Sequence, residues 1–291
     1  MLVDIALPVI LTVIMFSLGL GLVPADFARV FREPRAFWVG AFIQMLVVPA
    51  AAFTAAIAFG LPPELAVGTI ILGLSPGGVL SNVSSKLAGG NVPLSVSMTA
   101  LSSLASILTL PPLVALSVTY FMGADAPPVD VAGLGLQMFL LTAVPVGLGM
   151  LLTAILPRQV PIISYWMGKV ALGLFVVVLL AALVANWDLF VANVGTLAPA
   201  LITMNAALVA IGLLTSRLAG LNARDTTSVA IESAVQNGTL GIAVGVIVAG
   251  AASGLPPTTL PTAIYSITVW LLTIPLIFWR RSVEAGAVQP A

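Results

Sequence analysis

Long apolar runs alternate with short polar connections along this chain, and the pattern predicts membrane-spanning helices. A helix needs about 20 mostly apolar residues to cross the hydrocarbon core of a bilayer. Nine stretches meet this requirement, and the segments between them contain the Gly, Pro and Asp residues typical of turns. The predicted spans are residues 4–24, 36–60, 63–86, 91–121, 131–156, 162–186, 189–216, 223–250 and 257–279.

Composition agrees with a lipid environment. The chain is 60% hydrophobic and only 7% charged, whereas soluble domains carry about 25% charged residues. A chain so poor in charge would expose a largely apolar surface, for which lipid is the suitable solvent. We therefore predict an all-α polytopic membrane protein, with the lipid bilayer as its partner. Because no linker is long enough to separate soluble domains, we expect one transmembrane domain over residues 1–291.

The basic residues predict the direction of the spans. If the N-terminus lies outside and the spans alternate, nine of the ten Lys and Arg residues fall in cytoplasmic loops or at cytoplasmic helix ends. The tenth, Lys169, lies near the cytoplasmic end of its span and can extend to the interface. The C-terminus is then cytoplasmic. No basic segment precedes the first apolar run, which argues against a cleaved signal peptide.

Two of the predicted spans are interrupted near mid-depth. The span 63–86 contains Pro76-Gly77-Gly78, and proline both removes a backbone donor and clashes with the preceding turn. The span 223–250 contains the polar stretch 232–239. A single Pro or Gly site would be read as a simple kink, but two sites flanked by polar residues in matching places favour discontinuous helices.

The order of the spans predicts how the two interrupted helices are related. They are the third and eighth spans, so they cross the membrane in opposite directions. This arrangement indicates an inverted repeat, in which discontinuous helices meet at the midplane. The expected halves are residues 1–122 and 130–282.

Glu232 is the one acidic residue deep within a predicted span. It lies about ten residues from the start of that span, which is about 15 Å at 1.5 Å per residue, near the centre of a core about 30 Å thick. A charged group there costs about 2.5–3.5 kcal/mol on insertion scales. Because no Lys or Arg lies at the same depth, Glu232 is either protonated or neutralised by a cation that the protein does not supply.

Neutral oxygen donors accompany Glu232 on the interrupted spans and on their neighbours. Such oxygens suit Na⁺ better than a transition metal, and the chain contains neither His nor Cys. Ser102 and Ser106 continue one stripe of hydroxyls, but we assign them to helix packing through bonds to their own helix. The oxygen donors expected beside Glu232 are Gln44, Ser81, Asn82, Ser95, Thr99, Gln236 and Asn237.

These residues occur within motifs that resemble the bile acid:sodium symporter family, in particular a bacterial member. The likeness covers almost the whole chain, and the motifs are specific in combination. They are Met15-Phe16-Ser17-Leu18-Gly19-Leu20, Pro24-Ala25-Asp26-Phe27, Pro76-Gly77-Gly78 with Ser81-Asn82, Gly90-Asn91, Leu94-Ser95-Val96, and Glu232 with Gln236-Asn237.

The resemblance implies a core domain and a panel domain, with two sodium sites beside the crossing of the broken helices. The first site would use Ser81, Asn82, Ser95, Thr99 and Glu232. The second would use Gln44, Glu232 and Gln236, with backbone oxygens of Ser233 and Val235. The resemblance also implies a multi-pass protein of the bacterial inner membrane. Members of the family often have ten spans, so we expect this chain to lack the leading helix.

Together, the residues and the resemblance predict a sodium-coupled symporter of a small organic anion that works by alternating access. Each half-helix N-terminus carries about half a positive charge and free amide donors, which suit a carboxylate. The residues expected to bind the substrate are Gly78, Val79, Leu80, Asn237, Gly238 and Thr239.

Other functions are weighed against this prediction. Proton coupling through Glu232 alone would need no cage of oxygens, and a passive channel would give flux without sodium or saturation. Intramembrane proteases need two carboxylates or His ligands, so we do not expect an enzyme. The metalloid-efflux branch resembles one that uses Cys, which is absent. A net charge of zero predicts no nucleic-acid partner, and nothing implies a protein partner.

Overall fold

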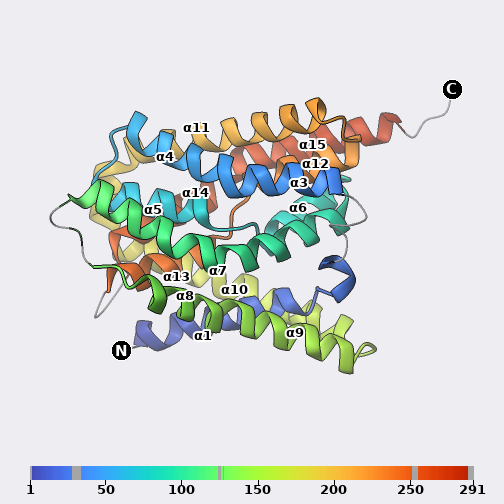
Figure 1. Cartoon of the computed structure of the whole chain (residues 1–291), viewed down its shortest axis with the longest axis horizontal. Helices are drawn as coiled ribbons and strands as arrows, with labels where there is room; N and C mark the ends of the chain where they lie inside the picture. The colour runs from blue at the N-terminus through green and yellow to red at the C-terminus, as the bar shows by residue number, and fades with distance from the viewer. Residues whose placement is uncertain (1, 28–33, 124–125, 127, 251–254, 288–291) are drawn as a thin grey trace.

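The structure is a computed structural model that describes residues 2–27, 34–123, 126, 128–250 and 255–287, with side-chain environments between residues 8 and 283. Every regular element in these ranges is a helix (Figure 1). In chain order the elements are α1 (Leu2–Gly19), α3 (Pro34–Phe42), the π-helix η1 (Ile43–Val47), α4 (Val48–Ala58), α5 (Pro63–Leu74), α6 (Val79–Leu87), α7 (Val92–Met122), α8 (Val131–Met138), the π-helix η3 (Phe139–Ala143), α9 (Val144–Ile155), α10 (Val160–Ala185), α11 (Trp187–Leu218), α12 (Ala223–Ala234), α13 (Gly238–Ala249), the 3₁₀-helix η4 (Pro257–Thr259), α14 (Leu260–Thr268) and α15 (Trp270–Ala287).

The described helices fit a polytopic membrane protein. Seven segments, some of which join consecutive elements such as α3, η1 and α4 (Pro34–Ala58), are long and apolar enough to cross a membrane. An eighth is added if α5 and α6, which are bent by 60° relative to each other, form one span. A shorter apolar helix, Pro8–Gly19, belongs to α1. Each of the nine predicted spans therefore contains helix, while nine crossings remain a prediction.

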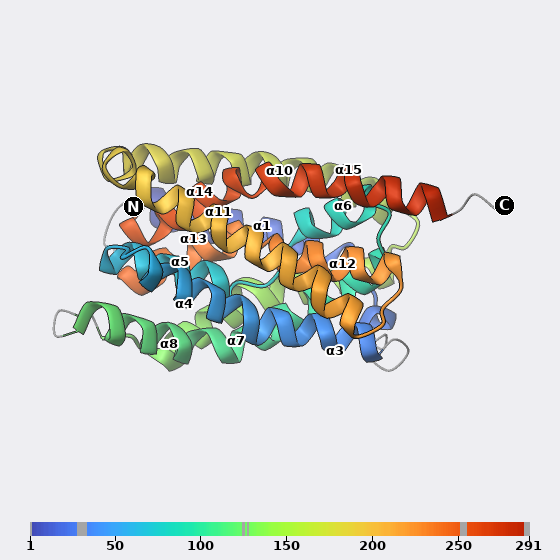
Figure 2. The ribbon, with the colours of Figure 1, turned by 90° about the horizontal axis from the view of Figure 1, so that it is seen from above.

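Successive spans run in opposite directions along the bundle. The ends of α6, α9, α11 and α15 and the starts of α3, α10 and α12 lie at the same end (Figures 1 and 2). Most of the basic residues occur in or next to these helix ends, whereas Arg29 and Arg32 lie outside the described residues. The N-terminal end of α1 lies at the opposite end of the bundle from the end of α15 (Figure 1).

The helices form two groups. In the smaller group, α1 packs along η3, α9 and α10, and these helices lie together below the others in Figure 1. Gly149 permits close approach of α9 to α1, because an added Cβ would lie 2.5 Å from the Phe16 carbonyl oxygen. The larger group surrounds α12, which contacts α3, α6, α7, α11 and α15 and is buried from Asp225 to its last residue, Ala234.

The two breaks lie where the sequence predicts them, and they touch each other. Helix α5 ends at Leu74 and α6 begins at Val79, while α12 ends at Ala234 and α13 begins at Gly238. The backbone N–H of Asn237 in the second break donates to the Pro76 carbonyl in the first, at 2.7 Å. One direct hydrogen bond therefore joins the two interruptions at the centre of the larger group.

A π-helical turn places Gln44 beside these breaks. The segment η1 ends just before Val48-Pro49, and η3 likewise ends before Val144-Pro145. Proline lacks the N–H that a regular helix would use at this point, and the wider turn supplies another bond, from the Val48 N–H to the Ile43 carbonyl. Such π-bulges often occur at functional sites.

Gly212 allows α11 to pack directly against α12. An added Cβ at Gly212 would lie 2.8 Å from the Ala230 Cα, so the helices would have to separate. Gly212→Ala is therefore expected to lower stability by about 1–3 kcal/mol, the usual effect of overpacking. The measurement is the thermal unfolding midpoint of the protein purified in detergent.

The matched control for Gly212→Ala is Gly195→Ala on the same helix, where an added Cβ meets no atom within 4 Å. This change should leave stability equal or raise it slightly, because alanine favours helix over glycine by about 0.5–1 kcal/mol. Equal midpoints for the two variants would contradict the close contact of α11 with α12.

Candidate ion and substrate site

Glu232 lies in the last turn of α12, with none of its surface exposed. Two hydroxyls of α7 reach its carboxylate. Ser95 Oγ lies 2.9 Å from Oε2, and Thr99 Oγ1 contacts Oε1. Because Ser95 and Thr99 are four residues apart, they share one face of α7, and that face points at the carboxylate.

The Asn82 side chain on α6 shares the same two hydroxyls. Its Oδ1 lies 2.8 Å from Ser95 Oγ and 3.2 Å from Thr99 Oγ1. Each hydroxyl has one proton, so two protons serve four contacts between oxygen atoms. The surplus lone pairs make this cluster a good set of ligands for a hard cation, which prefers carboxylate, amide and hydroxyl oxygens.

Ser81 and Gly77 border the same cluster. Ser81 Oγ donates to the Gly78 carbonyl at 2.7 Å and accepts from the Gly78 N–H at 3.1 Å, so it caps the start of α6. An added Cβ at Gly77 would lie 2.0 Å from Glu232 Oε1 and 3.0 Å from Ser81 Oγ. A side chain at position 77 would therefore displace the Glu232 carboxylate from its present place.

A second polar group joins the two breaks through amide side chains. Gln44 Nε2 donates to the Ser75 carbonyl at 3.1 Å and to Gln236 Oε1 at 2.9 Å. Gln236 Nε2 donates to the Ser233 carbonyl at 2.7 Å. Gln44 Oε1 is buried without a hydrogen-bond partner, so an oxygen ligand remains free at this place.

The residues predicted for the second sodium site do not lie on one continuous helix. Because α12 ends at Ala234, Gln236 lies in the break and not on the helical face of Glu232, where an intact helix would place it. Val235 is buried within the break, and the Ser233 carbonyl already accepts a bond from Gln236.

A small cavity of about 60 Å³ lies between the starts of α6 and α13 on one side and α1 and α10 on the other. Its walls on α1 and α10 are mainly apolar and include Met15 and Phe175. All six residues that the sequence predicts for substrate binding line this cavity: Gly78, Val79, Leu80, Asn237, Gly238 and Thr239.

Two helix N-termini meet at the cavity. The first backbone N–H groups of a helix have no partner within the helix and attract anions. At the start of α13, the Asn237 side chain accepts from the Leu240 N–H at 3.1 Å and from Thr239 Oγ1 at 3.0 Å. The side chains of Asn237 and Thr239 therefore bond to each other in this structure, and Gly238 and Thr239, the first residues of α13, line the cavity.

Two further hydroxyls of α7 bond within their own helix and not to the carboxylate of Glu232. Ser102 donates to the Met98 carbonyl and Ser106 to the Ser103 carbonyl, both within α7. The sequence analysis missed Met15 and Phe175, because apolar residues in apolar helices carry no distinguishing signal. It also missed Asn205, a buried amide in the middle of α11, whose polarity within an apolar span was a detectable signal.

Comparison with known proteins decides the family. A family model described as the sodium bile acid symporter family matches residues 8–193, more than half of the chain. The chain belongs to this family. It is therefore a member of a family of membrane transporters and not of enzymes.

Three relatives illustrate the range of the sodium bile acid symporter family. The chain is 30% identical over 275 residues to the probable chloroplastic sodium/metabolite cotransporter BASS1 of Arabidopsis thaliana, covering 94% of this chain and 66% of that one. It is 29% identical over 259 residues to the uncharacterized sodium-dependent transporter YocS of Bacillus subtilis (strain 168), covering 89% and 78%. It is 28% identical over 235 residues to the human ileal sodium/bile acid cotransporter, covering 79% and 66%. The chain thus spans slightly less than two thirds of the length of the first and third.

Gly77→Ala tests the contact between the first break and Glu232. A methyl group 2.0 Å from Oε1 must displace the carboxylate from the hydroxyls of α7. We expect the rise in thermal midpoint on replacing choline chloride with sodium chloride to be lost, or to need at least tenfold more sodium. The control is Gly173→Ala on α10, where an added Cβ meets no atom within 4 Å. An unchanged sodium response in Gly77→Ala would contradict this geometry.

Proposed function

We propose that this chain is a sodium-coupled symporter of a small organic anion, with a carboxylate as the recognised group. The observation that carries the proposal is the environment of Glu232. A fully buried carboxylate shares two hydroxyl protons with the Asn82 amide oxygen. Hydroxyl groups alone do not neutralise a buried charge, whereas a bound cation both neutralises it and uses the surplus lone pairs.

Two sodium ions fit the two polar groups. The first would be bound by Ser81, Asn82, Ser95, Thr99 and Glu232. The second would be bound by Gln44, Gln236 and Glu232, with backbone oxygens of Ser233 and Val235, and the free oxygen of Gln44 supports it. The sodium ions are transported together with the substrate, so their binding must be reversible.

The proposed coupling follows from the position of the second break. Gln236 bonds to Gln44 on the ion side, and the next residue, Asn237, bonds to Pro76 and lines the cavity. An ion that fixes Gln236 therefore also fixes the start of α13 at the cavity. Sodium binding would in this way order the N-termini of α6 and α13 before the anion binds. The free-energy cost of ordering them on anion binding would then be smaller.

The cavity favours a small substrate in this conformation. A water-sized molecule needs about 10–15 Å³ of comparable space, so 60 Å³ accommodates only a few heavy atoms. The helix ends provide donors for a carboxylate, and Met15, Leu18 and Phe175 provide apolar contact. A short carboxylic acid with an apolar portion matches both features.

We propose alternating access for the transport step. In this proposal the panel consists of α1, α8, η3, α9 and α10, and the core consists of the remaining helices. The cavity lies at the boundary between panel and core. The contact across this boundary includes small or aliphatic side chains such as Met15, Ala100 and Ala243, which allow sliding without breaking charged pairs. We further propose nine crossings in the bacterial inner membrane, with the N-terminus outside and inverted-repeat halves.

Glu232→Gln tests the ion coupling. A thermal-shift screen of keto acids, hydroxy acids and sterol acids, each with sodium or choline, identifies a ligand for uptake into proteoliposomes. The wild type should show saturable uptake driven by an inward sodium gradient. Glu232→Gln should lose at least 90% of it, because a neutral amide removes the charge that attracts the ion. Ser102→Ala, which removes a hydroxyl bonded only within α7, should retain uptake.

Two results would contradict the proposal. Sodium-driven uptake by Glu232→Gln equal to that of the wild type would remove Glu232 from the coupling. Wild-type uptake driven by a pH gradient without sodium would instead indicate proton coupling through Glu232, and unsaturable flux without sodium would indicate a channel.

A further inference from the structure

Two buried amide side chains occupy matching places before the two broken helices. Gln44 lies on the span that precedes α5 and α6, and Asn205 lies on α11, which precedes α12 and α13. Gln44 stands 31 residues before its acceptor Ser75, and Asn205 stands 29 residues before its acceptor Ala234. Both side chains are at least nine-tenths buried.

Each amide supports the end of a broken helix. Gln44 Nε2 donates to the Ser75 carbonyl at 3.1 Å, and Asn205 Nδ2 donates to the Ala234 carbonyl at 3.0 Å. Carbonyls in the last turn of a helix have no partner within the helix, and leaving such a group unpaired in a buried place costs free energy. Each amide thus donates to a backbone carbonyl at the end of a broken helix.

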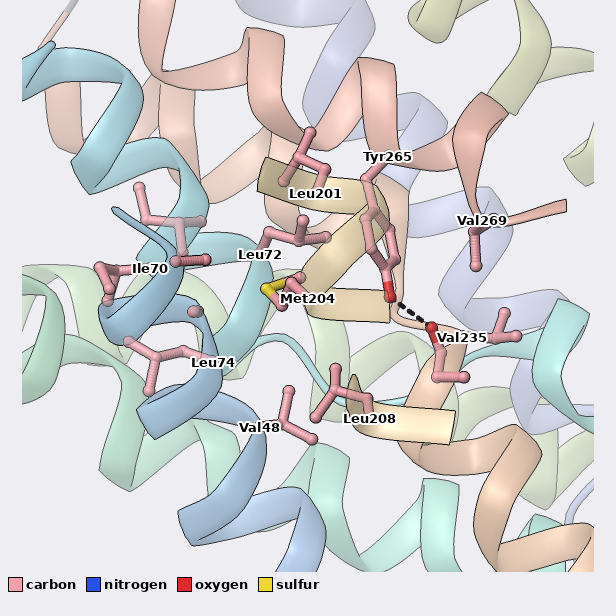
Figure 3. Close-up of a cluster of buried hydrophobic side chains, with 14 of the residues drawn as sticks. Val48, Ile70, Leu72, Leu74, Leu201, Met204, Leu208, Val235, Tyr265 and Val269 are labelled. Atoms are coloured by element: carbon pink, nitrogen blue, oxygen red, sulfur yellow. Dashed lines mark hydrogen bonds between the residues drawn. The ribbon is translucent and has the colours of Figure 1, made fainter. Parts of the chain in front are cut away.

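The second contact of each amide distinguishes the two places. Gln44 bonds to Gln236, which belongs to the proposed second sodium site. Asn205 instead donates to the Tyr265 hydroxyl at 2.8 Å, and that hydroxyl donates to the same Ala234 carbonyl at 2.5 Å. Figure 3 shows the Tyr265 bond inside a cluster of apolar side chains that includes Leu72, Met204 and Leu208.

The side-chain N–H and O–H groups of Asn205 and Tyr265 all find acceptors without an ion, while the Asn205 Oδ1 atom is buried without a hydrogen-bond partner. The Tyr265 hydroxyl donates its proton to the Ala234 carbonyl at the end of α12. In the first half of the chain, the partner of Gln44 is instead Gln236, a residue of the proposed ion site. The apolar surroundings exclude water and strengthen these bonds. Two donors, the Asn205 side-chain amide and the Tyr265 hydroxyl, therefore hold the Ala234 carbonyl in place in this structure.

We propose that Asn205 and Tyr265 are positioning residues that hold the second break in the geometry needed for sodium binding. Gln236 and Asn237 lie two and three residues beyond the supported carbonyl. A displacement of Ala234 would therefore also displace Gln236 and Asn237, because the backbone connects them. This inference rests on the proposed sodium coupling, and it assigns the two residues no contact with the ion.

Tyr265→Phe tests the inference, because it removes one hydroxyl and keeps the buried ring. The readout is the sodium concentration that gives half of the sodium-induced rise in thermal midpoint, with choline chloride holding ionic strength constant. We expect this concentration to increase about threefold to tenfold, as for the loss of one hydrogen bond. Tyr120→Phe on α7, at a residue that is 63% exposed, is the matched control and should keep the wild-type value.

Asn205→Leu provides a second variant of similar volume. It should raise the half-saturating sodium concentration in the same direction. The double variant should show less than the sum of the two effects, because both residues act on one carbonyl.

A lower midpoint in both salts with an unchanged half-saturating concentration, in either variant, would show a purely structural role and overturn the inference. Sodium coupling would survive that result. A wild-type protein with no sodium-dependent rise would overturn both proposals together.

Discussion

A carboxylate with too few protons around it is the constraint on which the proposed site depends. Glu232 is fully buried, and Ser95 and Thr99 each bring one hydroxyl proton to an oxygen cluster that also includes Asn82 and borders on Ser81. Removing a charge from water is costly unless another charge compensates for it. We propose that a transported sodium ion supplies this compensation at Glu232.

The two breaks convert this local requirement into a link between sites. Interrupting α5–α6 and α12–α13 frees backbone groups, which the structure satisfies through the Asn237–Pro76 bond and through Gln44. The same interruptions create two helix N-termini at the cavity. The proposed ion site and the cavity meet at Gln236 and Asn237, which are joined by one peptide bond and both line the cavity.

Much of this arrangement was predictable from the sequence. Apolar run lengths gave the spans, Pro76 and the polar stretch after Glu232 gave the breaks, and depth singled out Glu232 itself. The separation of Gln236 from the helical face of Glu232 was not predictable, because it depends on α12 ending at Ala234. The walls of the cavity and the Asn205–Tyr265 pair depend on which helices pack together, and an apolar pattern does not encode that choice in lipid, where most surfaces are equally apolar.

Infrared difference spectroscopy tests the central claim most directly. The spectrum of the purified protein in sodium chloride minus that in choline chloride reports changes at carboxylate groups. Direct binding of sodium to Glu232 predicts a shift in a carboxylate stretching band in the wild type that disappears in Glu232→Gln. No sodium-dependent carboxylate signal, or the same signal in Glu232→Gln, would contradict the account.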